Sequence, residues 1–467
     1  LELAIRLRNE FNMRLNPQVI IILAALHPKR QEFNKENPLL YRQIVDQVLK
    51  IPSDLFNQFK LYLRFSETKS KNKLPGIVKQ CWADKIEKMS SYHMKKYLES
   101  GHIIDMIRIA HPRSTKNPYI EEVIKTGNIK VTNTEHTWET LKSQGLNWNQ
   151  ITDQIQLPHM AILRNLRNLI YDDSISNEKL ENILEYMVNT TKNGKQFPFR
   201  YWTSYNEINK GLYMPKKKRS EKYKQKMENI IRISNEEKYI NRTNMCKKYL
   251  EKCLHVAMDN FPKLKGKTIS LCDNSGSARG TFNSVYGSVQ VSTIANLSAI
   301  LTAYNSDEGW VGVFGDNLKY YKVCKDKSIL EQLDEVNNLG NVVGDCTENG
   351  IWLFFDEALK GNHIYDNIFC MSDLQAGHGS LYGENVNDYM AFRFKNSKYI
   401  DVLMLVKEYR KVVNEKVNVF SVQVGGYNNS ILPENLYRGA LLAGWTGNET
   451  LYASQIIKLW NEIENIN

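Results

Sequence analysis

The chain has 467 residues, of which 42% are hydrophobic and 24% are charged, with a net charge of +11. This composition predicts two or three folded domains with buried cores and excludes a chain that is disordered throughout. No run of about 18 apolar residues occurs, so the sequence predicts no membrane-spanning helix, and seven cysteines without C-x-x-C spacing favour free thiols in a reducing, cytoplasmic compartment.

The first part of the chain is predicted to be helical. Apolar residues recur there at helical spacing, and short turns containing proline or glycine separate the runs. In chain order, the predicted helices are Leu15–Ala25, Pro38–Lys50, one beginning near Ser53, one beginning at Pro75, and then Met89–Leu98, Ile103–Ala110, Tyr119–Thr126, Thr137–Ser143, Trp148–Gln154, Met160–Ile170, Asn177–Asn189, Tyr201–Leu212, Lys222–Ile233 and Tyr239–Asp259. Short helices joined by brief turns are typical of stacked helical hairpins, so we predict an α-solenoid of the HEAT type with divergent repeats.

Charge is distributed unevenly between the two parts of the chain. Residues 1–262 contain 44 Lys and Arg against 28 Asp and Glu, a charge of +16, whereas residues 263–467 carry −5. A polyanionic partner would therefore meet the first part, although a solvated basic surface without a partner explains the charge equally well. The densest basic run, Lys216–Arg219, is a nucleic-acid patch, a nuclear-localisation signal or a solvated loop.

The second part of the chain has a different pattern. Beyond a predicted boundary at Asp259–Lys267, apolar strand-like runs alternate with helical ones, which divides the chain into predicted domains 1–262 and 263–467. The runs are Thr268–Cys272, Val289–Ala303, Trp310–Phe314, Tyr320–Val323, Ile329–Asn337, Ile351–Leu359, Ile368–Met371, Tyr399–Val413, Val417–Val424 and Glu449–Glu464. This alternation predicts an α/β domain of the Rossmann type, whose mostly parallel sheet is covered on both faces.

A candidate metal site follows the first strand of that predicted sheet. The strand ends at Asp273, and Ser275 and Ser277 follow at every second position. Ligands bind at the carboxyl edge of such sheets, and carboxylate and hydroxyl oxygens suit Mg²⁺. A phosphatase of the haloacid dehalogenase type would need an aspartate at the position of Ser275, so the general acid of that reaction is missing.

Two later loops belong to the same predicted edge, namely residues 344–347 and the stretch around Asp373. In this order the three loops resemble the metal-ion-dependent adhesion site of a von Willebrand factor A domain. The resemblance implies a bound Mg²⁺ or another divalent cation. The ligands that it implies are Asp273, Ser275, Ser277, Asp373 and Thr347. Gly344 stands where that family has a threonine, so Thr347 or Asp345 would supply the missing oxygen.

Basic and aromatic residues of the helical part are candidate contacts for RNA. The candidates are Lys79, Lys95, Lys96, His102, Arg108, His111, Arg113 and, on a later helix, Arg164. A basic groove with stacking rings binds single strands, and the rings available are Trp82, Tyr92 and Tyr97. Structural alternatives stay open: Trp82 is more typical of a core, His111 of a helix C-cap, and Arg164 shares a helix face with Arg167 and suits a salt bridge equally well.

A basic helical solenoid followed by an A domain resembles the Ro autoantigen, or TROVE-module, family of RNA-binding proteins. The stretches that agree are Gly101–Pro112, Leu163–Leu166, Asp345–Thr347 with the following Ile351 and Trp352, and Asp373. The resemblance implies that the solenoid closes into a monomeric ring. Its hole would take single-stranded 3′ ends of misfolded RNA, and its basic outer surface would take a small noncoding Y-like RNA. RNA quality control, together with an RNA-processing protein as a further partner, is implied in the same way.

We therefore predict a non-catalytic RNA-binding component of a ribonucleoprotein. The sequence offers no nucleophile–base pair and no pair of acid/base carboxylates, which argues against an enzyme. The alternative is a protein-interaction scaffold that grips a partner through the metal of the A domain. A third, weaker alternative is a phosphatase or nuclease that uses the same metal loop.

Overall fold

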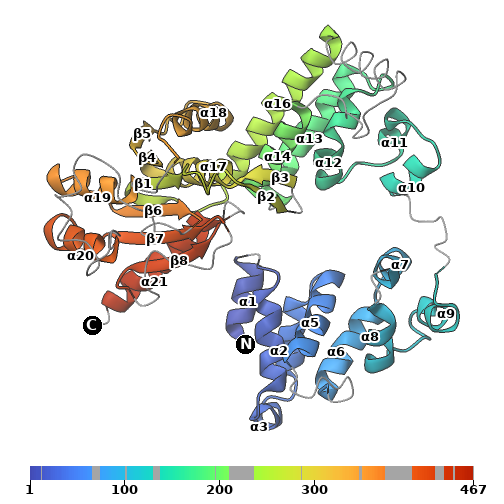
Figure 1. Ribbon diagram of the computed structural model, residues 1–467. Coiled ribbons are helices and arrows are strands. Elements are labelled where there is room, and N and C mark those ends of the chain that lie inside the picture. The colour runs from blue at the N-terminus through green and yellow to red at the C-terminus, as the bar shows by residue number, and fades with distance from the viewer. Residues whose placement is uncertain are drawn as a thin grey trace. The chain divides into compact units, whose positions relative to one another are not determined.

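The computed structural model describes residues 1–11, 13–65, 74–99, 102–129, 137–194, 196–209, 236–284, 287–345, 350–373, 402–425, 436–444 and 448–465. Within these ranges the helical region is followed by a mixed, mainly parallel α/β sheet, which confirms the predicted fold class (Figure 1). The chain divides into two compact units, Leu1–His136 and Thr137–Asn467. None of the described helices has the length and apolar character needed to cross a membrane.

The first unit is built entirely of helices in the ranges described. Their bounds are α1 Glu2–Asn9, α2 Asn16–Leu26, α3 Arg30–Glu36, α4 Leu40–Val48, α5 Pro52–Phe65, α6 Gly76–Glu87, α7 Ser91–Glu99, α8 Ile103–Ala110 and α9 Pro118–Thr126. Each amphipathic helix turns an apolar face into one shared core. In α8, for example, Ile103, Met106 and Ile107 follow helical spacing and are buried, while Arg108 is exposed.

The second unit begins with further helices. Their bounds are α10 Trp138–Ser143, α11 Trp148–Gln154, α12 His159–Ile170, α13 Asn177–Gly194, α14 Pro198–Asn209 and α16 Glu237–Met258. Arg242 of α16 is buried and fixes the turn between α12 and α13, because its guanidinium donates to the carbonyl of Ile170 (3.1 Å) and to Oδ1 of Asn177 (2.7 Å). The long α16 therefore holds the other helices in place.

A six-stranded sheet occupies the rest of the second unit. Its strands are β1 Leu264–Asp273, β4 Ser306–Phe314, β5 Leu318–Lys322, β6 Asn367–Ser372, β7 Asn418–Gln423 and β8 Gly439–Ala443, in the order β5-β4-β1-β6-β7-β8. Neighbouring strands are parallel except β4 and β5. Strand order reverses at β1, between β4 and β6, which is the kind of switch point where open α/β sheets bind ligands.

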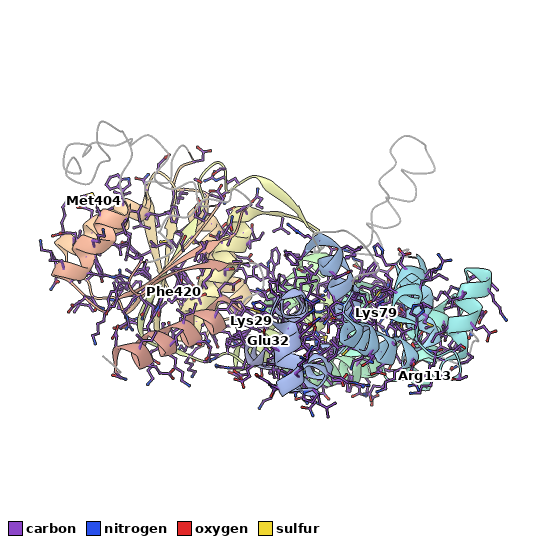
Figure 2. The ribbon with its side chains drawn as sticks, turned by 90° about the horizontal axis from the view of Figure 1, so that it is seen from below. Lys29, Glu32, Lys79, Arg113, Met404 and Phe420 are labelled. Atoms are coloured by element: carbon purple, nitrogen blue, oxygen red, sulfur yellow. The ribbon has the colours of Figure 1, made fainter. Side chains whose placement is uncertain are left out.

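Helices cover both faces of this sheet, as Figure 1 shows. Their bounds are α17 Val291–Tyr304, α18 Ile329–Gly340, α19 Gly350–Lys360, α20 Val402–Val412 and α21 Glu449–Glu464. Alternate strand residues face opposite cores: Phe420 packs with α17 and α21, whereas Val419 packs with α19 and α20. Figure 2 shows Phe420 within the sheet and Met404 on the covering helix α20. The predicted burial of both faces is confirmed.

Helices give way to strands between Met258 and Leu264, inside the stretch that the sequence predicts as a boundary. The two sides are tied together there, because the Glu251 carboxylate of α16 accepts the N–H of Ile329 at the start of α18 (2.6 Å). Both sides belong to one compact unit. The predicted boundary therefore marks where helices give way to strands, and the division into domains 1–262 and 263–467 stays a prediction.

A few elements differ from the sequence-based expectation. Residues 287–290, at the start of the predicted run Val289–Ala303, form strand β3 (Gly287–Gln290), which pairs with β2 (Thr281–Ser284), and the helix begins at Val291. Helices α1 and α3 and strands β2 and β8 were not predicted. The predicted helix Lys222–Ile233 and the basic run Lys216–Arg219 lie outside the described residues.

Candidate functional site

The loop after β1 brings polar side chains to the carboxyl edge of the sheet. Parallel pairing of Cys272 with Met371 places Asp273 beside Ser372, the last residue of β6. One carboxylate oxygen of Asp273 accepts the N–H of Ser275 (2.8 Å), and the other accepts the hydroxyl of Ser372 (2.8 Å). The hydroxyls of Ser275 and Ser277 lie 3.3 Å apart. Asp273, Ser275 and Ser277 therefore share one small site, as predicted from their spacing.

Two carboxylates are buried at this edge. Asp273 is fully buried and Asp373, which follows β6, is 1% exposed. Burial, followed by the nearby negative charge of Asp373, raises the pKa of Asp273 to about 6. A divalent cation would compensate both effects, and the hard oxygen donors of this edge suit Mg²⁺. Among the described residues, no group of three or more His, Cys, Asp or Glu side chains is placed to hold a metal ion, so a cation here would depend on these two carboxylates and the serine hydroxyls.

The second predicted metal loop lies against the first. The N–H of Gly276 donates to the carbonyl of Asp345 (2.8 Å), and a Cβ on Gly276 would come within 2.6 Å of that oxygen. Arg279 joins the two loops, because its guanidinium donates to the carbonyl of Gly340 (2.8 Å) and lies 3.7 Å from the Asp345 carboxylate. Thr347 lies outside the described residues.

Gly344, which stands where the A-domain family has a threonine, has a conformation that other residues rarely adopt. Its φ is +84°, and a Cβ there would overlap the Asp316 carboxylate. A threonine side chain is therefore incompatible with this backbone. The oxygen that the family takes from that position must come from another residue if the site binds a cation.

The predicted RNA contacts of the first unit lie on neighbouring helices, of which α6, α7 and α8 share a core. Lys95 and Lys96 on α7, and Arg108 on α8, are exposed, whereas Lys79 on α6 is half-buried. Figure 2 shows Lys79 on its helix and Arg113 beyond the end of α8. The exposed cations thus come from adjacent elements of a single unit.

Two of the predicted contacts also have clear structural roles. Exposed His111 forms the C-cap of α8 in the left-handed conformation (φ 54°), as its alternative interpretation proposed. His102 forms the N-cap of α8, and its ring centroid lies 5.8 Å from that of Phe59. A role in RNA binding would be additional to these contacts.

Arg113 is held by an acidic partner that the sequence did not indicate. Its backbone N–H and its Nε donate to Oε1 of Glu87 (2.9 and 3.2 Å), and Lys116 pairs with the other oxygen (3.3 Å). Burial opposes ionisation of Glu87, but these donors outweigh burial and lower the pKa of Glu87 to about 2. The positive charge of Arg113 is therefore partly neutralised.

The three aromatic candidates have different environments. Trp82 is fully buried and donates from Nε1 to Oε1 of Gln58 (2.9 Å), so it belongs to the core. Tyr97 stacks on Phe56 with ring centroids 3.9 Å apart. Tyr92 is 37% exposed on α7, the helix that carries Lys95 and Lys96. Of the three, Tyr92 has the exposure that a stacking platform for a base requires.

Arg164 lines a cleft between α12 and α14, together with Arg167 and Arg200. Arg164 is exposed, and Arg167 donates to both the carbonyl and the carboxylate of Glu207 on α14 (2.6 Å each). Arg200 was not predicted. Only the packing of α14 on α12 brings it near Arg164, and no local sequence pattern signals that approach.

Comparison with known proteins agrees with this architecture. The TROVE domain model matches residues 124–268, about a third of the chain, from the end of α9 to the start of β1. The crystal structure of the Deinococcus radiodurans Ro (RSR) protein superposes with a TM-score of 0.60 and 11% sequence identity, over 97% of this chain and 90% of that one. A search of curated protein sequences gives no significant match. Residues 124–268 are therefore similar to the TROVE domain, and the chain as a whole has a fold like that of the Deinococcus Ro protein.

Proposed function

We propose that this protein binds RNA on its basic helical region and holds it without bond chemistry. The observation that carries the proposal is the coincidence of the TROVE match and the Ro fold with a charge of +16 confined to residues 1–262. Lysine and arginine bind phosphates and release counterions, which supplies most of the affinity for any nucleic acid. The α/β part, at −5, adds no attraction of this kind.

The finer proposal concerns the RNA itself. The ligands that suit a Ro fold are a small structured noncoding RNA and the single-stranded 3′ end of a misfolded RNA. Exposed cations of α7 and α8, with Tyr92 beside them, provide phosphate donors and a ring for stacking. The protein would thus act in RNA quality control as part of a ribonucleoprotein.

Binding to a hairpin RNA with a single-stranded 3′ tail, measured by fluorescence anisotropy over a range of salt concentrations, tests this proposal. We expect tight binding at low salt, a steep loss at high salt, and about tenfold weaker binding for Lys95→Ala/Arg108→Ala, with a smaller salt slope. The matched control is Arg6→Ala/Lys29→Ala, which removes two exposed cations of the same unit from α1 and from the turn before α3. If both double variants lose the same amount of RNA affinity, the loss reflects the change in net charge and not a specific site. An absence of salt-dependent RNA binding in the wild type would refute the proposal.

The Asp273 edge supports a second proposed role, in which the α/β domain holds a divalent cation. Asp273, Ser275, Ser277 and Asp373 would hold it, and the cation would supply positive charge to two buried carboxylates. A cation at such an edge can also take a carboxylate of a partner protein as a ligand. The alternative function is therefore a metal-dependent protein-interaction scaffold. Removal of the cation by a chelator should then abolish binding of the partner protein.

A further inference from the structure

We propose that a second cleft of the helical region binds one unpaired nucleobase of an RNA chain, with adenine preferred. This cleft, called the α13 cleft below, lies between α13 and the segment that joins α11 to α12. Its lining lies within residues 152–186, inside the range 124–268 of the TROVE match. The proposal deepens the proposed RNA-binding function, on which it rests, by adding a site for a base to the contacts with phosphates.

The two walls of the α13 cleft follow from the local sequence. Asn182 and Tyr186 are four residues apart on α13 and therefore share the face of the helix that lines the cleft. In the other wall, Ile155 ends α11 with an extended backbone (φ −139°, ψ 148°). Pro158 precedes α12 and favours an extended backbone in the residue before it. The cleft is thus bounded by a helix face and an extended stretch of chain.

The interior of the α13 cleft is largely apolar. Leu157 and Ile162 are buried, whereas Ile183 and Tyr186 are half-buried and pack against the same core. Tyr186 supplies the one aromatic ring among the described residues of the lining. The volume is about 450 Å³, toward the small end of the roughly 300–1,000 Å³ of small-molecule sites. A base that stacks on Tyr186 would cover this apolar surface, and a bare phosphate would leave it exposed to water.

The charged residues that line the α13 cleft neutralise each other. The ammonium group of Lys179 donates to Oδ1 of Asp153 (2.6 Å) and to the carbonyl and Oδ1 of Asn149 (2.9 and 2.8 Å). The amide of Asn149 in turn donates to the other carboxylate oxygen of Asp153 (3.3 Å). Asp153 and Lys179 are the only charged residues among the described residues of the lining. The cleft therefore favours an uncharged group over a phosphate or a carboxylate.

Three amide side chains complete the α13 cleft. Gln154, Gln156 and Asn182 are exposed and form no side-chain hydrogen bond with any residue in the described ranges. An amide pairs with the edge of adenine through one donor and one acceptor. Unpaired bases of RNA are read along such edges while they stack on aromatic rings. A ring, free amides and balanced charge together match an adenine base more closely than any charged ligand.

Adenosine tests the α13 cleft in isolation, because it carries the base without a phosphate. Saturation-transfer NMR with the full-length protein should show contact at the adenine protons, with the same affinity at low and high salt. Tyr186→Ala and Gln156→Ala/Asn182→Ala should each weaken the binding by about tenfold. The matched controls are Tyr205→Ala on α14 and Asn189→Ala on α13, which replace residues outside the cleft and should leave the affinity unchanged.

The same variants test the α13 cleft within an RNA chain. An oligouridylate of about ten nucleotides with one central adenosine should bind the wild type about three- to tenfold more tightly than the all-uridine chain, in anisotropy titrations. Gln156→Ala/Asn182→Ala should abolish this preference and keep the salt dependence, since the phosphate contacts are untouched. Circular dichroism and thermal melting of each variant confirm that the fold is intact.

Two outcomes would overturn the inference and leave the proposed function standing. In the first, both RNA chains bind with equal, salt-dependent affinity and adenosine does not bind, so the cleft is not a base site. In the second, N-acetyltryptophanamide binds in a manner that depends on Tyr186 and adenosine does not, so the occupant is an aromatic side chain of a partner protein.

Failure of the proposed function is recognised separately. If the wild type shows no salt-dependent binding to either RNA chain, the RNA-binding proposal fails, and with it the RNA as the source of the base. Adenosine then judges the α13 cleft alone. Binding that is lost in Tyr186→Ala would support a pocket for a base, and no binding would refute it.

Discussion

The hydroxyl of Ser372 donates a hydrogen bond of 2.8 Å to Oδ2 of Asp273, across the parallel pairing of β6 with β1. Oδ1 of Asp273 accepts the N–H of Ser275 at 2.8 Å. Both carboxylate oxygens therefore accept hydrogen bonds from neighbouring serines. This arrangement orients a buried carboxylate beside Asp373 and leaves it able to bind a cation. The protonation of Asp273 and the loss of folding stability caused by its buried charge can both be measured.

Asp273→Asn should stabilise the metal-free protein by about 1–3 kcal/mol near pH 7.5. The substitution removes a charge that is fully buried and repelled by Asp373, and whose pKa is raised by about two units, each worth about 1.4 kcal/mol. The asparagine oxygen can keep the N–H of Ser275, and the Ser372 hydroxyl can rotate to accept from the amide. Chemical denaturation in the presence of EDTA measures the change.

We expect Mg²⁺ to raise the melting temperature of the wild type, and the same variant should lose this increase. Asp326→Asn, an exposed aspartate of the same domain, is the matched control and should change neither quantity. A metal-free Asp273→Asn protein that is less stable than wild type would contradict the repulsion between the two carboxylates.

Cation binding should weaken as the pH falls below about 6. The pKa of Asp273 is raised to about 6, so below that pH a cation must displace a proton from the folded protein. The affinity should then drop by about tenfold for each pH unit, and above pH 6 it should change little through this group. Isothermal titration calorimetry with Mg²⁺ at several pH values measures the dependence.

The folding stability of the metal-free protein should depend on pH in the opposite direction to its affinity for the cation. Because the folded pKa exceeds the unfolded one, the folded state binds the proton more tightly, and Asp273 contributes more stability as the pH falls from about 6 to 4. Asp273→Asn should remove this trend. An affinity for Mg²⁺ that stays constant between pH 5 and 8 would argue against Asp273 as a ligand.

Gly344→Thr should destabilise the protein by about 1–3 kcal/mol and should not improve cation binding. The residue has φ +84°, which is strained for any side chain, and the new Cβ overlaps the Asp316 carboxylate. Combining Gly344→Ala with Asp316→Ala should recover the steric part of the loss and leave the backbone part. Denaturation curves of the single and double variants separate the two terms. A stable Gly344→Thr protein with tighter cation binding would show that the loop can rearrange.

The sequence predicts some parts of this molecule well and others poorly, for identifiable reasons. The Asp273 loop was predictable because an apolar strand and its polar end are adjacent in the chain. Strand β8, G-A-L-L-A, lacks β-branched residues and was missed. The ion pair of Arg113 with Glu87 joins residues 26 positions apart, and the cleft of Arg164 and Arg200 depends on helix packing. Such contacts arise from tertiary structure, and no local pattern reports them.

Trp82 and Tyr92 should respond in opposite ways to substitution, since one is fully buried and the other is 37% exposed. Trp82→Phe removes the N–H that Gln58 accepts at 2.9 Å, so it should cost about 1–3 kcal/mol of stability and leave RNA affinity unchanged once the protein is folded.

Tyr92→Ala should leave stability nearly unchanged and weaken RNA binding by about tenfold, because stacking of a base on an aromatic ring is worth about 1–3 kcal/mol. Tyr320→Ala, at 38% exposure in the α/β domain, is the matched control and should leave RNA affinity as in the wild type. Thermal melting and anisotropy titrations on the same preparations measure both quantities. If Tyr92→Ala binds RNA as tightly as the wild type, Tyr92 of α7 does not stack on a base. If a folded Trp82→Phe protein binds RNA more weakly, the core around Gln58 determines the shape of the RNA interface.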